Sequence, residues 1–149
     1  MKNLFLSFPK LTGPLRSIYN YFVGEKEIKF LYKFINQENI EFNFFDVGAN
    51  YGVYTFLFGP RANKIFVFEP IEECVEYIKA GYRKNNIEYI NKILSDTNEE
   101  KMINIPIENK KKIYGKSSVN NQFSISEKRM LPTLCLDQFV RNAEFDENK

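Results

Sequence analysis

The spacing of hydrophobic residues predicts that the chain begins with a lead-in followed by one amphipathic helix. Two Pro and two Gly residues interrupt residues 1–24, so we expect irregular structure there, with room for one short helix. From residue 25, apolar side chains recur at the three- and four-residue spacing of one helical face, with charged residues between them. The residues of this face are Ile28, Leu31, Tyr32 and Ile35. Residues 36–39 are expected to end the helix.

Two compact apolar runs predict the first two strands. Residues 42–47 form a Phe-rich run that ends in a Gly-containing turn, a pattern typical of a buried strand that leads into a loop. We expect the next helix to begin near Asn50, which can cap it, and to end by Gly59 and Pro60. Residues 64–68 are rich in Ile, Val and Phe and are predicted as the second strand.

A longer helix and a third strand are predicted next. Pro70 stands where a first helical position belongs, and two acidic residues follow in the expected first turn. Apolar side chains then repeat on one face as far as Tyr82, and residues 85–86 close the predicted helix. Residues 89–94 are predicted as the third strand.

This order of elements indicates an α/β fold with an open, mostly parallel sheet. Strands that alternate with helices of this length are joined by right-handed parallel crossovers. Beyond Asp96 the helical spacing disappears, and residues 102–107 and 130–136 are predicted as two strands that pair antiparallel. We interpret residues 1–39 as the N-terminal lead-in and helix, and residues 40–149 as one domain.

Composition and charge exclude several classes of function. The formal net charge of +2 is too small to indicate nucleic-acid binding. The chain has no His, which removes Ser-His-Asp and Cys-His catalysis and any His metal ligand. Cys74 and Cys135 stand far apart and match no metal-ligand spacing, so we expect no metal site. Cys74 falls on an apolar helical stripe and is interpreted as a small core residue.

The N-terminus shows no targeting signal that we can identify. The apolar patch over residues 4–8 is shorter than the roughly 7–15 apolar residues of a signal peptide, and no small-residue cleavage site follows it. No apolar stretch approaches the roughly 20 residues that a membrane span needs. We therefore expect a cytoplasmic protein without a membrane span.

The residues with the clearest chemistry lie where the first predicted strand meets its turn. Asp46 stands at the carboxyl end of this strand, and Gly48 follows it in the turn. In doubly wound sheets this position binds ligands, because the turn leaves backbone N–H groups pointing into a crevice. Gly48 permits a tight turn, and Gly52 lets the next helix pack near the strand. Glu69 follows Gly48 by about 20 residues, the spacing expected of a carboxylate that accepts hydrogen bonds from a ribose.

The turn differs from a dinucleotide-binding fingerprint. That fingerprint has a small residue where this chain has Asn50, and here an Asp stands in front of the turn. S-adenosylmethionine carries no phosphate, and its ammonium and sulfonium make Asp46 an electrostatically favourable neighbour. Its carboxylate could accept hydrogen bonds from N–H groups near Gly52 and Thr55. A nicotinamide-dependent oxidoreductase, which Asn50 argues against, and a ligand-free strand-ending turn are the alternatives.

Several segments of the chain, in order, resemble motifs of the FkbM-type methyltransferases. The stretch F-D-V-G-A-N-Y-G at residues 45–52, with Y-T at residues 54–55, is similar to the family's F-D-V-G-A-N-x-G-x-Y-T motif. The stretch F-V-F-E-P at residues 66–70 resembles its second-strand motif. The stretch L-S-D at residues 94–96 resembles its A-L-S-D motif, with Ile93 in place of the usual Ala.

Two later segments extend the resemblance over roughly residues 40–140. Residues 115–118 are similar to the family's G-x-S-S element, and residues 133–137 to its T-L-D element, with Cys135 as a departure. The resemblance implies a Rossmann-like class I methyltransferase fold with S-adenosylmethionine as cofactor. It also implies methyl transfer to a hydroxyl of a sugar or secondary metabolite, so the acceptor would be a small molecule or a glycan.

The resemblance also implies roles for individual residues. The methionine portion of the cofactor and the backbone turn would be held by Asp46, Gly48, Asn50, Gly52 and Thr55. Glu69 would bind both ribose hydroxyls. The adenine would be flanked by Pro70, Ser95 and Asp96, although the Ser-Asp pair can equally be interpreted as the start of a β-turn. No general base is assigned, since methyl transfer from a sulfonium needs mainly proximity and in-line alignment.

The chain departs from the family at its C-terminal end. In the family, the T-L-D element is followed by another parallel strand, ending in K-x-D-x-E-G, which packs beside the first strand. Residues 138–149 contain no such segment, so we expect a fold that is incomplete on this side, with residues 42–46 as an uncovered strand edge. This favours an alternative function, a truncated and non-catalytic module that binds a nucleoside or a partner chain. A homo-oligomer or a completing partner chain would cover the edge.

Overall fold

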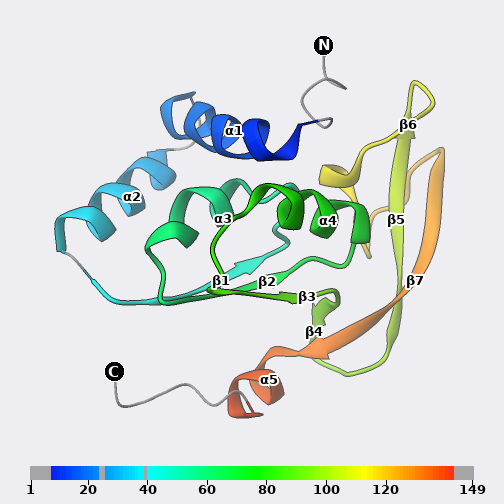
Figure 1. Cartoon of the computed structure of the whole chain (residues 1–149). Helices are drawn as coiled ribbons and strands as arrows, with labels where there is room; N and C mark the ends of the chain where they lie inside the picture. The colour runs from blue at the N-terminus through cyan, green and yellow to red at the C-terminus, as the bar shows by residue number, and fades with distance from the viewer. Residues whose placement is uncertain (1–7, 24–25, 39, 143–149) are drawn as a thin grey trace. The chain divides into compact units, whose positions relative to one another are not determined.

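The computed structural model describes residues 8–23, 26–38 and 40–142. The chain divides into two compact units, Met1–Asn91 and Lys92–Lys149. Each unit has its own sheet, and both contain parallel strands, so the expected α/β class is confirmed at this level (Figure 1). Residues 40–149, interpreted from the sequence as one domain, contribute to both units.

The first unit is built on a parallel sheet of three strands in the order β1-β2-β3. The strands are β1 (Asn43–Val47), β2 (Lys64–Phe68) and β3 (Ile87–Ile90), and both pairings are parallel. β2 is central and its last four residues are buried, which explains why its sequence is an almost continuous apolar run. In the described part of the chain β1 pairs with β2 alone, so it lies at the edge, as expected.

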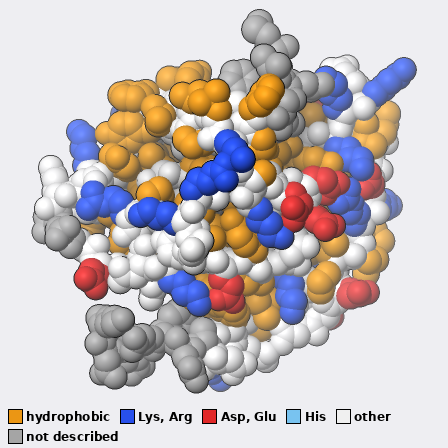
Figure 2. Space-filling view, in the orientation of Figure 1, with side chains coloured by type: hydrophobic (Ala, Val, Ile, Leu, Met, Phe, Trp, Pro, Cys, Tyr) orange, Lys and Arg blue, Asp and Glu red, His pale blue; other side chains and the backbone are white. Residues whose placement is uncertain are grey.

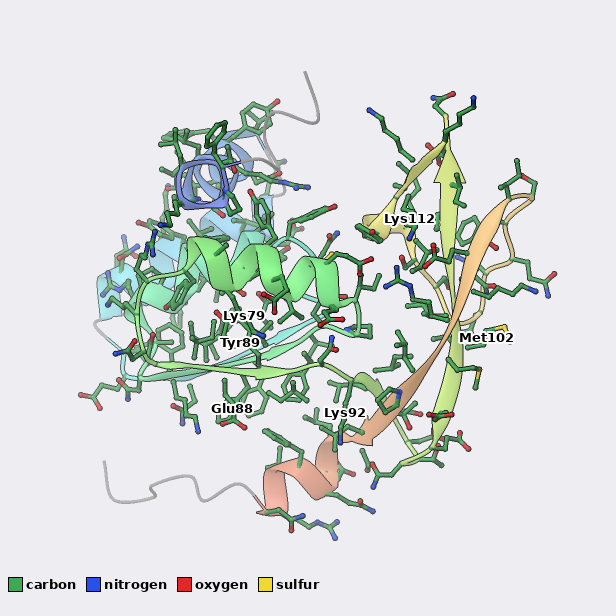
Figure 3. All side chains as sticks on the ribbon, turned by 45° about the vertical axis from the view of Figure 1, so that its right-hand side comes forward. Lys79, Glu88, Tyr89, Lys92, Met102 and Lys112 are labelled. Atoms are coloured by element: carbon green, nitrogen blue, oxygen red, sulfur yellow. The ribbon has the colours of Figure 1, made fainter. Side chains whose placement is uncertain are left out.

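Two short helices connect these strands and cover one face of the sheet (Figure 1). α3 (Val53–Phe58) continues into the 3₁₀ turn η2 (Gly59–Arg61), and α4 (Glu72–Gly81) joins β2 to β3. The core between them and the sheet consists of Ala49, Ala62, Ile65, Val67, Ile78 and Tyr82. At the rim, Lys79 of α4 lies over the ring of Tyr89 in β3, with 5.5 Å between its Nζ and the ring centroid (Figure 3).

Two further helices precede the sheet, α1 (Pro9–Val23) and α2 (Lys26–Glu38). The prediction of only one short helix in residues 1–24 was wrong for the described residues 8–23, because α1 has 15 residues and includes Pro14. Residues 1–7 and 24 of the predicted lead-in lie outside the described part of the chain. Packing explains this length. Gly13 lies directly against the ring of Phe56, and the Thr12 hydroxyl is 2.7 Å from the Tyr77 hydroxyl of α4. Tertiary contacts therefore outweigh the low helix propensity of Pro and Gly. Among the described helices, none combines the length and the apolar character needed to cross a bilayer.

Several predicted boundaries were wrong by a few residues. α2 runs to Glu38, beyond the start of the predicted break at residues 36–39. α4 begins at Glu72 rather than at Pro70 and ends at Gly81, before residues 85–86. The extended backbone of Ile71 at the N-cap and of Tyr82 at the C-cap sets these limits.

The predicted third strand is divided between the two units. One strand was predicted over residues 89–94, but the structure has two strands there. β3 ends at Ile90 in the first sheet, and β4 (Ile93–Ser95) belongs to the second sheet. Asn91 lies at the break, and its side-chain amide donates a hydrogen bond of 2.7 Å to the backbone carbonyl of Glu69. This contact holds the end of β3 against the end of β2.

The second unit is a mixed sheet in the order β4-β7-β5-β6. The long strands β5 (Glu100–Glu108) and β7 (Ser126–Cys135) pair antiparallel, which confirms the predicted pair, although both are longer than expected. β4 pairs parallel with β7, and β6 (Lys111–Lys112) pairs antiparallel with β5. The 3₁₀ turn η3 (Tyr114–Lys116) lies between β6 and β7, and α5 (Leu136–Asn142) follows β7.

Candidate functional site

The candidate site in the first unit is built on the turn between β1 and α3. Gly48, Asn50 and Gly52 have φ values of 67°, 51° and 74°. These values lie in the left-handed region, which residues other than Gly rarely adopt. The Gly48 N–H donates to the carbonyl of Phe68 at 2.8 Å, which ties the turn to the end of β2. The turn is therefore tight and fixed against the neighbouring strand, as the glycines predict.

Asn50 does not cap the helix, contrary to the prediction. α3 begins at Val53, its N-cap residue is the left-handed Gly52, and no side chain caps it. The positive φ values at Asn50 and Gly52 delay the helix, because an α-helix needs negative φ at every residue. The backbone N–H of Asn50 instead donates to Oε2 of Glu69 at 2.6 Å. The Asn50 side chain accepts from the thiol of Cys74 at 3.6 Å.

Glu69 connects the turns that follow β1 and β2. Its Oε1 accepts from the Ile71 N–H at 2.9 Å, and its Oε2 accepts from the Asn50 N–H. The side chain is thus fixed by two backbone donors, and the residue is only 4% exposed. A carboxylate has about four acceptor positions, so both oxygens retain the capacity to accept a further hydrogen bond.

Asp46 is paired with Thr55 across the same turn. Thr55 lies in α3, and its hydroxyl donates a short hydrogen bond to Oδ2 of Asp46. Asp46 is 4% exposed and Thr55 is fully buried. The structure therefore brings together two residues that the sequence placed at one ligand turn, and shows that they contact each other directly.

Burial governs the protonation of both acids. Burial raises the pKa of Asp46, while hydrogen bonds from the side chain and the backbone of Thr55 lower it. Burial also raises the pKa of Glu69, the N–H groups of Ile71 and Asn50 lower it, and the charge of Asp46 raises it further. The ionised forms of two buried carboxyl groups disfavour each other. A nearby cation or hydroxyl donors would stabilise these ionised forms.

The two glycines of the turn differ in what surrounds them. A Cβ built on Gly48 meets no atom within 4 Å, and the residue is exposed. A Cβ built on Gly52 would lie 2.8 Å from Cγ1 of Ile78. Gly52 therefore makes room for the side chain of Ile78 in α4, whereas the sequence predicted that it lets the helix pack near the strand. Gly48 leaves open space beside the backbone, where a ligand can approach closely.

Two residues of this site were not predicted from the sequence. The Ile71 N–H holds Glu69, and the Asn91 side chain binds the Glu69 carbonyl. The first could have been found from the Glu-Pro-Ile sequence, because Pro70 has no N–H and the next available donor belongs to Ile71. We see no sequence signal that identifies Asn91. Cys74 is buried, which confirms its interpretation as a core residue.

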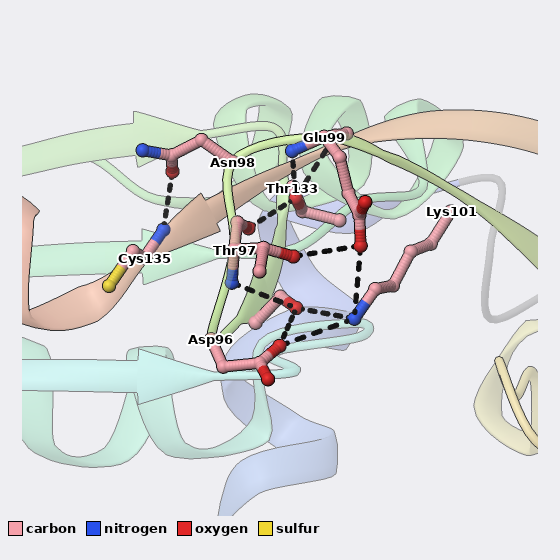
Figure 4. A network of polar contacts seen from close by, with 8 residues as sticks. Asp96, Thr97, Asn98, Glu99, Lys101, Thr133 and Cys135 are labelled. Carbon is pink, nitrogen blue, oxygen red and sulfur yellow. Dashed lines mark hydrogen bonds and ion pairs between the residues drawn. The ribbon is translucent and has the colours of Figure 1, made fainter.

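Ser95 and Asp96 belong to the second unit, where both contact Lys101, and Figure 4 shows Asp96 beside Lys101. The Ser95 hydroxyl donates to Oδ1 of Asp96 at 2.9 Å, and Lys101 Nζ donates to the Ser95 hydroxyl at 2.6 Å. The hydrogen bond from Ser95 is the largest cause of the lowered pKa of Asp96, followed by its own backbone and by Lys101. The backbone bends at residues 96–99, and both interpretations of the pair, as the start of a β-turn and as neighbours of an adenine, stay predictions.

The same network contains a buried hydroxyl at the start of the T-L-C-L-D segment (Figure 4). The Oγ1 of Thr133 accepts from the Glu99 N–H at 2.7 Å and lies 2.6 Å from the carbonyl of Thr97. We expect Thr133→Val to lower the free energy of unfolding by about 1–2 kcal/mol, because it removes a buried hydroxyl together with its hydrogen bonds to the Glu99 N–H and the Thr97 carbonyl. Urea denaturation measures this loss. Thr97→Val, at an exposed position, is the control and is expected to be nearly neutral.

Within the described residues, no group of three or more Cys, Asp or Glu side chains is arranged to hold a metal ion. The chemistry that the first unit offers is therefore that of two buried carboxyl groups and backbone donors around an open glycine. The comparisons with known proteins add no family to this description. No family model matches the chain, and neither a curated protein nor a solved structure does so.

Proposed function

We propose that the chain binds S-adenosylmethionine at the carboxyl ends of β1 and β2 and that it is a methyltransferase acting on a hydroxyl group. The observation that carries this proposal is the position of Glu69. Its carboxylate is held by the N–H groups of Asn50 and Ile71 and lies beside the open Gly48 turn. A fixed acceptor at the end of the second strand suits the two ribose hydroxyls of a nucleoside.

A Rossmann-like methyltransferase fold is part of this proposal. The parallel order β3-β2-β1, with α3 and α4 as connections, is the order found in one half of a doubly wound sheet. In such sheets ligands bind outside the carboxyl ends of the strands, which is where Asp46 and Glu69 lie. The FkbM-type motif over residues 45–55 supports the same choice of ligand.

The residues of the turn would position the cofactor, which would supply a methyl group on a sulfonium sulfur. Transfer of that methyl group to the acceptor oxygen would release the sulfur as a neutral thioether and the hydroxyl proton to solvent. Gly48 lets the ligand approach the backbone, and Glu69 accepts hydrogen bonds from the ribose. Asp46, held by Thr55, provides negative charge near the cationic methionine portion. Because displacement at a methyl group depends on alignment, holding the ligand rigidly is the main contribution that these residues can make.

A second candidate function is a non-catalytic module that binds a nucleoside or a partner chain. Two observations favour it. Both buried carboxyl groups already have partners within the protein. In addition, β1 pairs only with β2 in the described part of the chain. An incomplete sheet could bind the cofactor through Glu69 and still lack the groups that hold an acceptor.

Thermal unfolding with and without S-adenosylmethionine tests the proposal. Ligand at about 100 times its dissociation constant should add about 2.7 kcal/mol, a shift of several degrees. We expect Glu69→Gln to lose most of this shift, because one amide position becomes a donor that faces backbone N–H groups. Glu72→Gln, in the exposed first turn of α4, is the matched control and should keep the shift.

The outcomes separate the candidate functions. A shift together with transfer of a labelled methyl group to a sugar or phenolic hydroxyl supports the enzyme. A shift without transfer to any acceptor tested favours the binding module. No shift with S-adenosylmethionine, together with quenching or enhancement of NADH fluorescence, would favour the nicotinamide alternative and overturn the proposal.

A further inference from the structure

The helix α1 has an unusual distribution of side chains. The face that packs against α3 and α4 contains small residues, and Thr12, Gly13 and Ser17 are buried there. The large apolar residues point to solvent instead. They are Phe8, immediately before the helix, and Leu11, Leu15, Ile18 and Phe22, and they are between 49% and 66% exposed.

We call these five residues the N-terminal apolar face. They follow one another at alternating spacings of three and four residues, so they form one continuous stripe along the helix. A soluble surface helix normally directs such a stripe to the core. Here the core contacts of α1 are made by the small residues, so the stripe contributes little to the packing of the unit.

α2 also exposes aromatic residues. Phe30 and Phe34 are both exposed, and their rings stack with centroids 6.3 Å apart. Tyr19 of α1 is exposed as well. Figure 2 shows hydrophobic side chains gathered on the side of α1, with Lys and Arg side chains beside them. Contiguous apolar surface of this kind marks an interaction site rather than ordinary solvent exposure.

The charge of this segment indicates the chemistry of the partner. α1 contains Lys10 and Arg16 and no acidic residue. α2 adds three basic residues and two acidic ones, so the two helices together carry five basic and two acidic residues. Positive charge is thus concentrated around the apolar surface, and a complementary partner is anionic.

We propose that the N-terminal apolar face docks on an anionic lipid bilayer, with α1 lying along the surface. Apolar and aromatic side chains would enter the boundary between headgroups and acyl chains, and the Lys and Arg side chains would contact lipid phosphates. A second copy of the chain fits less well, because two cationic helices without acidic residues repel each other at close range. Membrane docking would bring the candidate site to a lipid surface.

Co-sedimentation of the full chain with lipid vesicles tests this proposal. We expect binding to phosphatidylcholine vesicles that contain phosphatidylserine, and at least about tenfold weaker binding without it or at high salt. The double variant Leu11→Ser with Phe22→Ser should lose binding. Its matched control is Ile125→Ser with Met130→Ser, which changes two similarly exposed apolar residues in the second unit and should bind normally. Circular dichroism verifies that each variant is folded.

A charge reversal provides an independent arm of the experiment. Lys10→Glu should weaken binding to the anionic vesicles, whereas Lys128→Glu, at an exposed position on β7, should not. Equal binding to both lipid compositions, or an equal loss in the control variants, would overturn the proposal. So would a concentration-dependent dimer in sedimentation equilibrium that the α1 variants dissociate, since the face would then be an interface between copies.

Discussion

Gly52→Val is expected to lower the free energy of unfolding by about 3 kcal/mol or more, the largest effect that we predict for a single substitution. Two costs combine at this position. The φ of 74° is unfavourable for any residue with a Cβ, and for a β-branched residue most of all. The new Cβ would also lie 2.8 Å from Cγ1 of Ile78, a fully buried side chain with no room to move away. Urea denaturation followed by circular dichroism measures the loss.

Gly48→Ala is the control that separates these two costs. Its φ of 67° is similar, but its Cβ meets no atom within 4 Å, so only the backbone cost of about 1–2 kcal/mol is expected. Gly52→Ala should cost more than this. Combining it with Ile78→Ala should give less destabilisation than the two single losses added together. Equal losses at the two glycines would contradict the steric argument.

The parts of the fold that depend on local pattern could be predicted from the sequence. β2 was predicted over residues 64–68 and is observed there. A strand in the centre of a sheet is buried on both faces, so its sequence is a nearly unbroken apolar run. The antiparallel pairing of β5 with β7 was predicted for a related reason, since the helical spacing is lost throughout that region. Each strand taken by itself is encoded in a few consecutive residues.

The parts that depend on tertiary contacts could not be predicted in this way. The length of α1 comes from Gly13 and Thr12, which fit against Phe56 and Tyr77 far along the chain. The apolar stripe of α1 even suggests the wrong face for burial. The division of residues 89–94 depends on Asn91, whose side chain binds a backbone carbonyl of another strand. None of these three contacts leaves a periodic signal in the sequence.

In the candidate site, too, the individual hydrogen bonds could not be predicted from the sequence. The sequence indicated that Asp46, Thr55 and Glu69 belong to one turn region, and the structure places all three in the first unit. The sequence did not indicate that the Thr55 hydroxyl donates to Asp46, or that the backbone N–H of Asn50 donates to Glu69. Which donor meets which acceptor depends on the left-handed backbone conformations at residues 48, 50 and 52. The close approach of Gly52 to Ile78 of α4 is a tertiary contact.

Thr55→Val is expected to lower the free energy of unfolding by about 1–3 kcal/mol at neutral pH. The substitution keeps the shape of a fully buried side chain but removes the hydroxyl that donates to Asp46. The carboxylate would then be buried without this donor, and leaving a buried charged group short of a hydrogen bond has a cost in this range. The loss should depend on pH, which distinguishes it from a simple packing defect.

The sign of this dependence follows from the pKa of Asp46. Burial raises this pKa in the folded state above the value of 3.8 that we take for the unfolded chain. Between the two values the folded state binds more protons, so the free energy of unfolding falls as the pH rises through that interval. Thr55→Val removes a hydrogen bond that lowers the pKa, so the interval should widen upward. Below it, where Asp46 is protonated in both states, the variant should lose less stability.

Asp46→Asn provides the matched background for this measurement. The amide has no charge to bury, so the decline in stability with rising pH should be shallower than in the original chain, with Glu69 as the remaining buried acid. In this background Thr55→Val should have a smaller effect that does not change between mildly acidic and neutral pH. Urea denaturation of all four proteins across this range gives the coupling between the two residues at each pH. A coupling that is the same at every pH would show that the charge of Asp46 is not what Thr55 stabilises.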